Sequence, residues 1–99
     1  MSEKSIEQKL RIAVKLAGGI ALKFVSPSLD GMPDRLVLLP NGKVGFVEVK
    51  ATGKSPTALQ LKRHEQLRRL GFLVFVLDNP EQIPHIIRTI GGSPNVNGV

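Results

Sequence analysis

The sequence contains no cysteine, tryptophan or tyrosine, and its aromatic side chains are four phenylalanines in 99 residues. Without cysteine the chain can form neither a disulfide framework nor a thiolate metal site. No apolar run reaches the length of a transmembrane helix, and the opening MSEKSIEQKL lacks the apolar core of a signal peptide. These absences favour a cytoplasmic protein with no membrane partner.

Acidic residues are scarce relative to basic ones, 8 against 14, which gives a formal net charge of +6. A basic excess of this kind favours a polyanionic partner, most often nucleic acid. Aromatic stacking platforms are few, so phosphate contacts should dominate that binding. The apolar fraction of 41% suffices for one core. We therefore expect a single domain over residues 1–90, followed by a loose tail, rich in Gly, Ser, Pro and Asn, over 91–99.

Residues 31–50, GMPDRLVLLPNGKVGFVEVK, predict a β-hairpin. The Pro-Asn-Gly at 40–42 suits a type I turn followed by a left-handed glycine, which is a three-residue hairpin loop. Such a loop pairs Leu39 with Lys43. Counting back along both strands then pairs Asp34 with Glu48.

Three charged side chains of this hairpin are expected to converge. Glu48 and Lys50 are two apart on a strand and therefore share a face, and a residue paired with Glu48 shares that face too. A two-residue loop would instead pair Asp34 with Val49 and place it on the other face. The proline favours the longer loop, so Asp34, Glu48 and Lys50 should form one cluster.

The remaining elements surround the hairpin. The spacing of apolar residues and of turn signals predicts three helices, two further strands and mixed strand directions. The second hairpin strand, a helix and the next strand form a βαβ unit, so those two strands should be parallel. Both hairpin faces are apolar, which requires helices on both sides of the sheet. The expected order is helix 5–16, capped by Ser5 with Gln8; strand 20–25; the hairpin; helix 56–70, capped by Ser55; strand 72–77; and helix 83–90.

The second helix carries two possible sheet-facing stripes. Leu59, Leu67 and Leu70 are the apolar one, and we expect them to face the sheet. An adjoining stripe contains Gln60, His64 and Leu67. Because no second His or Cys accompanies it, His64 is interpreted as a helix-flank residue rather than a metal ligand.

Two carboxylates and an amine on one patch of a basic protein suggest metal-assisted phosphodiester hydrolysis. Carboxylates are the hard ligands that Mg²⁺ prefers, with Mn²⁺ as a substitute, and Mg²⁺ keeps several waters. The metal would lower the pKa of one water and offset charge on the phosphate. Lys50 would hold that water or stabilise the developing negative charge. The Val49 carbonyl lies beside the cluster as a possible further ligand.

The element order, with PD and then E-V-K, resembles the PD-(D/E)XK nuclease superfamily. More narrowly, GMPD at 31–34, FVEVK at 46–50 and SPTALQ at 55–60 resemble the VRR-NUC family over most of the chain. This resemblance implies an α/β, restriction-endonuclease-like αβββαβ core with a mixed sheet flanked by helices. It also implies Asp34 and Glu48 as metal ligands, Lys50 as the catalytic lysine, Gln60 as a residue that orients the lysine or a phosphate, and Glu7 as an acid of the first helix that binds metal.

Two parts of this site remain open. Glu7 lies at the border of the buried stripe of the first helix, and Glu3 shares much of that position. Lys54 and the backbone at Ser55 could hold a DNA phosphate at the start of the second helix. Lys62 and Arg63 could track phosphates or simply form a solvated face.

The resemblance also suggests a substrate and an assembly. Stand-alone, phage-encoded members are similar to Holliday junction resolvases and act as homodimers. We therefore expect a Mg²⁺-dependent, structure-selective DNA endonuclease acting on branched DNA in a bacterial host. A flap or splayed-arm nuclease and an inactive nucleic-acid-binding module are the alternatives. Candidate interface residues are Leu61, the tail over 91–99, and the isoleucines of the last helix, Ile83, Ile86, Ile87 and Ile90.

Gly53-Lys54-Ser55 follows a strand and opens a helix, as in a nucleotide-binding P-loop. A Walker A pattern needs glycine five residues before Gly53. That position is Glu48, so no nucleotide cofactor is expected.

Overall fold

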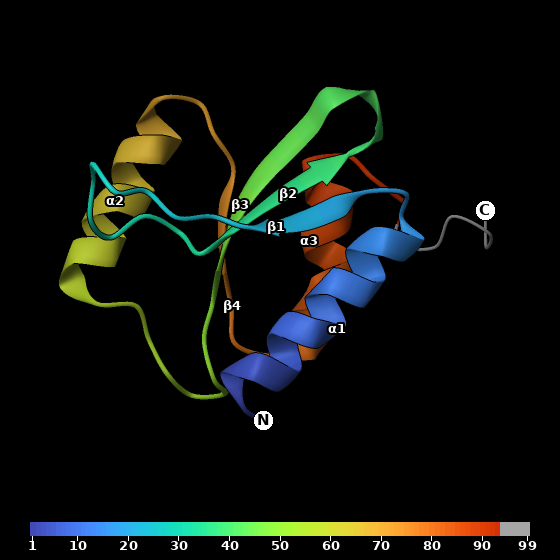
Figure 1. The fold of residues 1–99 in the computed structure, drawn as a ribbon, viewed down its shortest axis with the longest axis horizontal. Helices are drawn as coiled ribbons and strands as arrows, with labels where there is room; N and C mark the ends of the chain where they lie inside the picture. Colours follow the sequence, from blue (N-terminus) through green and yellow to red (C-terminus); the bar gives the residue numbers. More distant parts are fainter. Residues whose placement is uncertain (94–99) are drawn as a thin grey trace.

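The structure is a computed structural model that describes residues 1–93. A four-stranded sheet in the order β1-β2-β3-β4 is combined with three α-helices (Figure 1). β1, β2 and β3 are antiparallel neighbours, whereas β4 runs parallel to β3. The α/β fold with a mixed sheet is the predicted one. The elements are α1 (Glu3–Leu16), β1 (Ile20–Lys23), β2 (Arg35–Leu39), β3 (Lys43–Val49), α2 (Ala58–Arg69), β4 (Val74–Leu77) and α3 (Ile83–Ile90).

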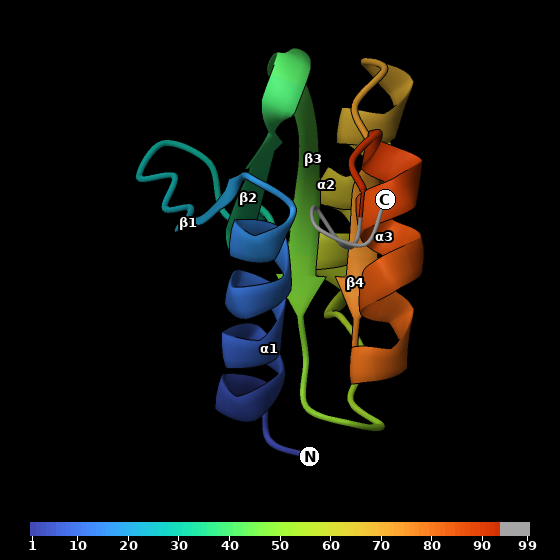
Figure 2. The same cartoon turned by 90° about the vertical axis from the view of Figure 1, so that its right-hand side faces the viewer.

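Helices cover the two faces of the sheet unequally. In Figure 2, α1 and α3 lie in front of the sheet and α2 lies behind it. The larger core lies between the sheet, α1 and α3, and it includes Leu10, Val37, Val49 and Ile87, all fully buried. A smaller cluster around Phe46, with Leu67 from α2 and Val74 from β4, lies on the other face. The site residues of β3 must therefore lie on the α2 side.

The hairpin register is the predicted one. Leu39 pairs with Lys43 and Arg35 with Val47, so the three-residue loop is confirmed. The turn itself differs from the prediction, because Asn41 (φ 67°) is left-handed as well as Gly42 (φ 71°). Asn tolerates this conformation better than most residues, so the loop length is kept.

Both predicted helix caps were wrong. Ser2 caps α1, its side chain accepting from the Ser5 N–H at 3.1 Å, so the helix begins earlier than expected. Thr57 rather than Ser55 caps α2, because Thr57 and Gln60 form a reciprocal capping box. The Ser-Pro pair at 55–56 lies in the preceding loop, since the two-sided Thr57–Gln60 arrangement satisfies two backbone groups at once.

The last helix, α3, has the predicted bounds, but its isoleucines do not form an interface. Ile83, Ile86, Ile87 and Ile90 are all buried against the domain's own sheet and α1. Across residues 1–93, none of the helices is both long and apolar enough to span a bilayer. Most of the tail that was proposed to reach a partner, residues 94–99, lies outside the described part of the chain.

Candidate active site

The hairpin register brings Asp34 and Glu48 together at the end of the sheet. Asp34 directly precedes β2, and its Oδ1 accepts a hydrogen bond from the Val49 N–H at 3.0 Å. Glu48 lies on β3, on the same face as Phe46, and is only 2% exposed. Strand periodicity and the three-residue loop therefore place both carboxylates where the sequence predicted.

The Glu48 carboxylate is surrounded by three side chains. Oε2 accepts from Gln60 Nε2 at 3.3 Å and lies 3.8 Å from Lys50 Nζ. On the other side, Oε1 lies 3.5 Å from His64 Nε2. Lys50 and Gln60 thus join the site as predicted. His64 joins it unexpectedly.

Burial raises the pKa of both carboxyl groups, and the charge of Asp34 raises that of Glu48 further. The pKa of Glu48 rises to about 7, first because it is desolvated and then because Asp34 is close, with Lys50 only partly compensating. Burial likewise raises the pKa of Asp34, against the Val49 hydrogen bond that lowers it. Two desolvated carboxylates without a full complement of positive charge are poised to accept a cation.

Gln60 serves two structures at once. Its Oε1 accepts from the Thr57 N–H at 2.9 Å as the return half of the capping box. Its Nε2 is thereby turned toward Glu48. The cap that begins α2 therefore also fixes the orientation of an amide in the site.

His64 is the residue that sequence reasoning missed. Its side chain is fully buried, and neither ring nitrogen has a hydrogen-bond partner. Burial lowers its pKa, with the charges of Arg68 and Lys50 adding to the effect. The i, i+4, i+7 spacing of Gln60, His64 and Leu67 was the available signal. The predicted sheet-facing leucines, Leu59 and Leu70, are 41% and 68% exposed.

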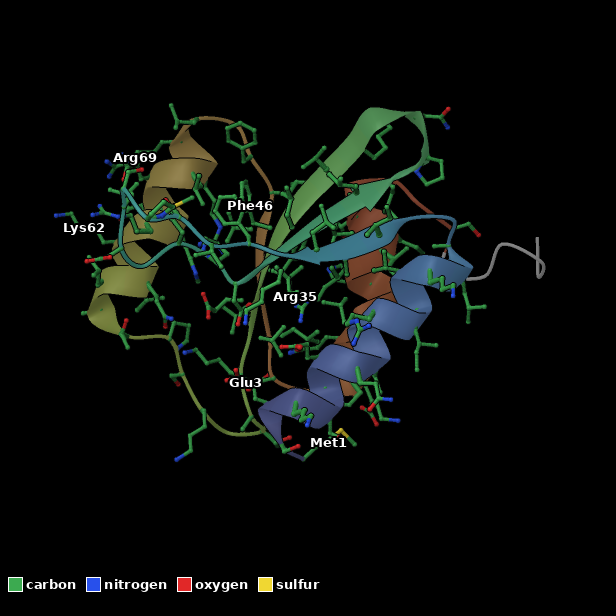
Figure 3. All side chains as sticks on the ribbon, in the orientation of Figure 1. Met1, Glu3, Arg35, Phe46, Lys62 and Arg69 are labelled. Atoms are coloured by element: carbon green, nitrogen blue, oxygen red, sulfur yellow. The ribbon has the colours of Figure 1, made fainter. Side chains whose placement is uncertain are left out.

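The two acids of α1 have different surroundings. Glu7 forms an ion pair with Arg35, which is buried on the opposite face of the sheet from Glu48. The negative charge of Glu3 raises the pKa of both Asp34 and Glu48, whereas the charge of Glu7 raises only the pKa of Asp34. Figure 3 shows Glu3 at the start of α1. The Met1 carbonyl accepts from the Thr52 N–H at 3.0 Å, which fastens this end of the helix beside the loop after β3.

The candidate DNA-binding residues line the α2 side. Lys54 and Ser55 are exposed in the loop before α2, and Lys62 lies on its outer face (Figure 3). The helix begins after Thr57, so the backbone at Ser55 is not its N-terminus. Arg63 Nε donates to the Asp30 carbonyl at 2.7 Å, which commits part of the guanidinium to the loop before β2.

The donor set fits a hard divalent cation. Glu48 Oε1 is buried without a hydrogen-bond partner, and Asp34 keeps an oxygen beyond the one that Val49 occupies. Within residues 1–93 no group of three or more His, Cys, Asp or Glu side chains is arranged to hold a metal ion. Mg²⁺ is compatible with this small set, because it is commonly held by one or two carboxylates together with waters and substrate phosphates.

Comparison with known proteins points to one group. No family model matches the sequence. The chain is 56% identical over 79 residues to the "Putative nuclease p44" of Acyrthosiphon pisum secondary endosymbiont phage 1, covering 80% of this chain and 85% of that protein. A solved structure described as a VRR_NUC domain is 30% identical, with a TM-score of 0.80 over 89% of this chain and 97% of that one.

The mixed sheet, the helices on both of its faces and the acid-acid-lysine cluster define a nuclease of the PD-(D/E)XK class. Within that class, the chain belongs to the VRR-NUC family.

Proposed function

We propose that this nuclease is a divalent-metal-dependent DNA endonuclease that hydrolyses phosphodiester bonds. The observation that carries the proposal is the convergence of Asp34, Glu48 and Lys50, in which the pKa of Glu48 is raised to about 7. Such a cluster is costly without a cation and serves no packing purpose. An inactive nucleic-acid-binding module would not need it.

Mg²⁺, with Mn²⁺ as a substitute, is the proposed ion, held by Asp34, Glu48 and the Val49 carbonyl. When bound, it would lower the pKa of a water and offset negative charge on the scissile phosphate. Lys50 Nζ, 3.8 Å from Glu48, is placed to orient the attacking water or to stabilise charge that develops on the phosphate oxygens. Gln60 holds Glu48 from the helix side.

The acid of the first helix is proposed from two candidates. Glu7 is the one that the family resemblance implies, but its ion pair with Arg35 occupies it. Glu3 forms no ion pair within residues 1–93, and its charge raises the pKa of both carboxyl groups. We favour Glu3 as the acid that acts through water or directly at the metal.

DNA is proposed to approach along α2 and the loop before it. Lys54 and Lys62 are exposed there and are free to contact phosphates. Ser55 follows Lys54 directly, and the N–H groups of Ala58 and Leu59 in the first turn of α2 can donate to a phosphate oxygen. Arg63 would help mainly by holding the loop at Asp30 against the helix.

Branched DNA is the proposed substrate, and a four-way junction is the form of it that the family resemblance favours. A panel of duplex, flap, splayed-arm and four-way-junction substrates, with Mg²⁺ or with EDTA, tests this directly. Paired nicks on a junction only in Mg²⁺ are expected. Preferential cutting of flaps would favour the flap-nuclease alternative, and cutting in EDTA would exclude the metal mechanism.

A homodimer is proposed, because symmetric resolution of a junction needs two equivalent sites and closed twofold dimers are the commonest oligomers. α2 covers only part of its sheet face, which leaves Ile20, Leu22 and Val44 at 57%, 42% and 37% exposed. An apolar patch can be self-complementary, whereas the basic surfaces of a chain with net charge +6 repel each other. We place the second copy there, with Leu61 of α2 as the rival site.

Sedimentation separates the two surfaces. Leu22→Asp should convert a dimer of the 10.8 kDa chain to monomers, and Leu61→Asp should leave it intact. The reverse result would move the interface to α2. A monomeric wild-type chain that still cuts junctions in pairs would exclude the dimer. The phage origin of the relative further suggests a phage-encoded protein that acts in the cytoplasm of a bacterial host.

A further inference from the structure

His64 has no role in the residue pattern from which the nuclease site was predicted, yet it contacts that site. The side chain is fully buried on α2, and its Nε2 lies 3.5 Å from Glu48 Oε1. Neither of these two atoms has a hydrogen-bond partner, and neither has His64 Nδ1. A residue that only filled the core would serve better as leucine, which has no polar atoms to leave unsatisfied.

The position of His64 on α2 gives this contact a geometric meaning. His64 follows Gln60 by four residues, so the two side chains lie on one face of the helix. Gln60 Nε2 donates to Glu48 Oε2, and His64 Nε2 faces Oε1. One face of α2 therefore approaches both oxygens of the Glu48 carboxylate: Gln60 approaches Oε2, and His64 approaches Oε1.

We propose that His64 is a positioning residue, which fixes the Glu48 carboxylate for metal binding by presenting its Nε2–H to Oε1. The inference rests on the proposed metal-dependent function. Each carboxylate oxygen can accept at two positions, so the contact leaves room for a cation on the same oxygen. Groups that orient a ligand in this way commonly change metal affinity 10- to 100-fold when they are removed.

Amide side chains of two lengths at position 64 give a test that does not depend only on removing the buried ring. His64→Gln can place its amide near the position of Nε2, whereas His64→Asn carries the same amide too short to reach Glu48. His64→Leu fills the space without any donor. His85→Leu, at an exposed histidine of α3, is the matched control.

Mg²⁺ binding to the full chain, measured by titration calorimetry, is the readout, with kcat on DNA as a second one. We expect His64→Leu and His64→Asn to weaken Mg²⁺ binding by about tenfold or more, and His64→Gln and His85→Leu to stay within about threefold of wild type. If His64→Leu does not fold, the Asn and Gln pair still decides.

Equal Mg²⁺ affinity in the Asn and Gln variants, or wild-type affinity in His64→Leu, would overturn the positioning role while leaving the proposed nuclease intact. A wild-type chain that neither binds Mg²⁺ nor cleaves DNA would overturn both proposals. Weaker Mg²⁺ binding with unchanged DNA affinity in His64→Leu and His64→Asn, but not in His64→Gln, would support the role, because a merely structural defect would lower both affinities.

Discussion

At the scale of single residues, the site is a buried acidic pair whose repulsion is only partly relieved. The pKa of Glu48 in the folded chain, about 7, lies above its ordinary value of 4.5. Between these values the folded state holds the proton more tightly than the unfolded state does. The free energy of unfolding therefore falls as pH rises through this window, and above it the loss is complete.

Glu48→Gln should remove this pH dependence. Without metal, the variant is expected to be more stable than wild type at pH 8, by on the order of 2 kcal/mol, and closer to wild type at pH 5. Thermal unfolding in EDTA at both pH values measures this, with the exposed Glu81→Gln as control. An equal shift in melting temperature at both pH values would show that the charge of buried Glu48 does not destabilise the fold.

Residue spacing was sufficient to predict part of the site. Asp34, Glu48 and Lys50 could be placed together because strand period and loop length alone decide their faces. His64 could not, because the apolar stripe through Leu59 suggested a different phase for α2. The sheet-facing stripe of that helix is largely polar because it borders the charged side chains of Glu48 and Lys50, and hydrophobic periodicity does not detect such a stripe.

At the scale of elements, α1 uses Glu7 in an ion pair with Arg35, and Glu3 is the acid that we propose for the site. Arg35 is 8% exposed and relies on Glu7 and the Ala21 carbonyl as partners. Glu7→Gln should therefore destabilise the fold, by roughly 1–3 kcal/mol, because a buried guanidinium loses its countercharge. Glu3→Gln should leave stability nearly unchanged and lower the rate of Mg²⁺-dependent cleavage.

Unfolding in urea and single-turnover cleavage of both variants separate these roles. A Glu7→Gln variant that unfolds in urea like wild type but is inactive would show that Glu7, as the family resemblance implies, is the helix acid at the metal. Full activity of Glu3→Gln would exclude Glu3.

Element boundaries were less predictable than element order. The bounds of the last helix, Ile83–Ile90, were predicted with Pro84 in its first turn, and the structure has the same bounds. The start of α2 was predicted too early because Ser55-Pro56 also resembles a helix start, although Thr57 and Gln60 have the T-x-x-Q spacing of the capping box that the structure forms. When two possible caps lie within two residues of each other, the sequence predicts the helix but not its first residue.

At the scale of the whole molecule, the net charge of +6 should govern DNA affinity. Binding measured by fluorescence anisotropy in EDTA should weaken at least about tenfold between 50 and 200 mM salt, because phosphate contacts release counterions. Lys62→Ala should weaken binding to all sequences alike and reduce the salt slope. Lys9→Ala, on α1 across the sheet, is the control. An equal loss of DNA affinity in this variant would mean that net charge, and not a defined surface along α2, governs binding.

The central claim is that Asp34 and Glu48 hold a divalent ion for DNA cleavage, and one comparison tests it most directly. Cleavage of a four-way junction is measured for wild type, Asp34→Asn and Asp30→Asn, each with Mg²⁺ and with EDTA. Asp30 lies four residues away and is exposed, so the same chemical change there should be silent. We expect wild type and Asp30→Asn to cut only with Mg²⁺ and Asp34→Asn to bind DNA without cutting it. Cleavage by Asp34→Asn at the wild-type rate, or by any of the three in EDTA, would contradict the account.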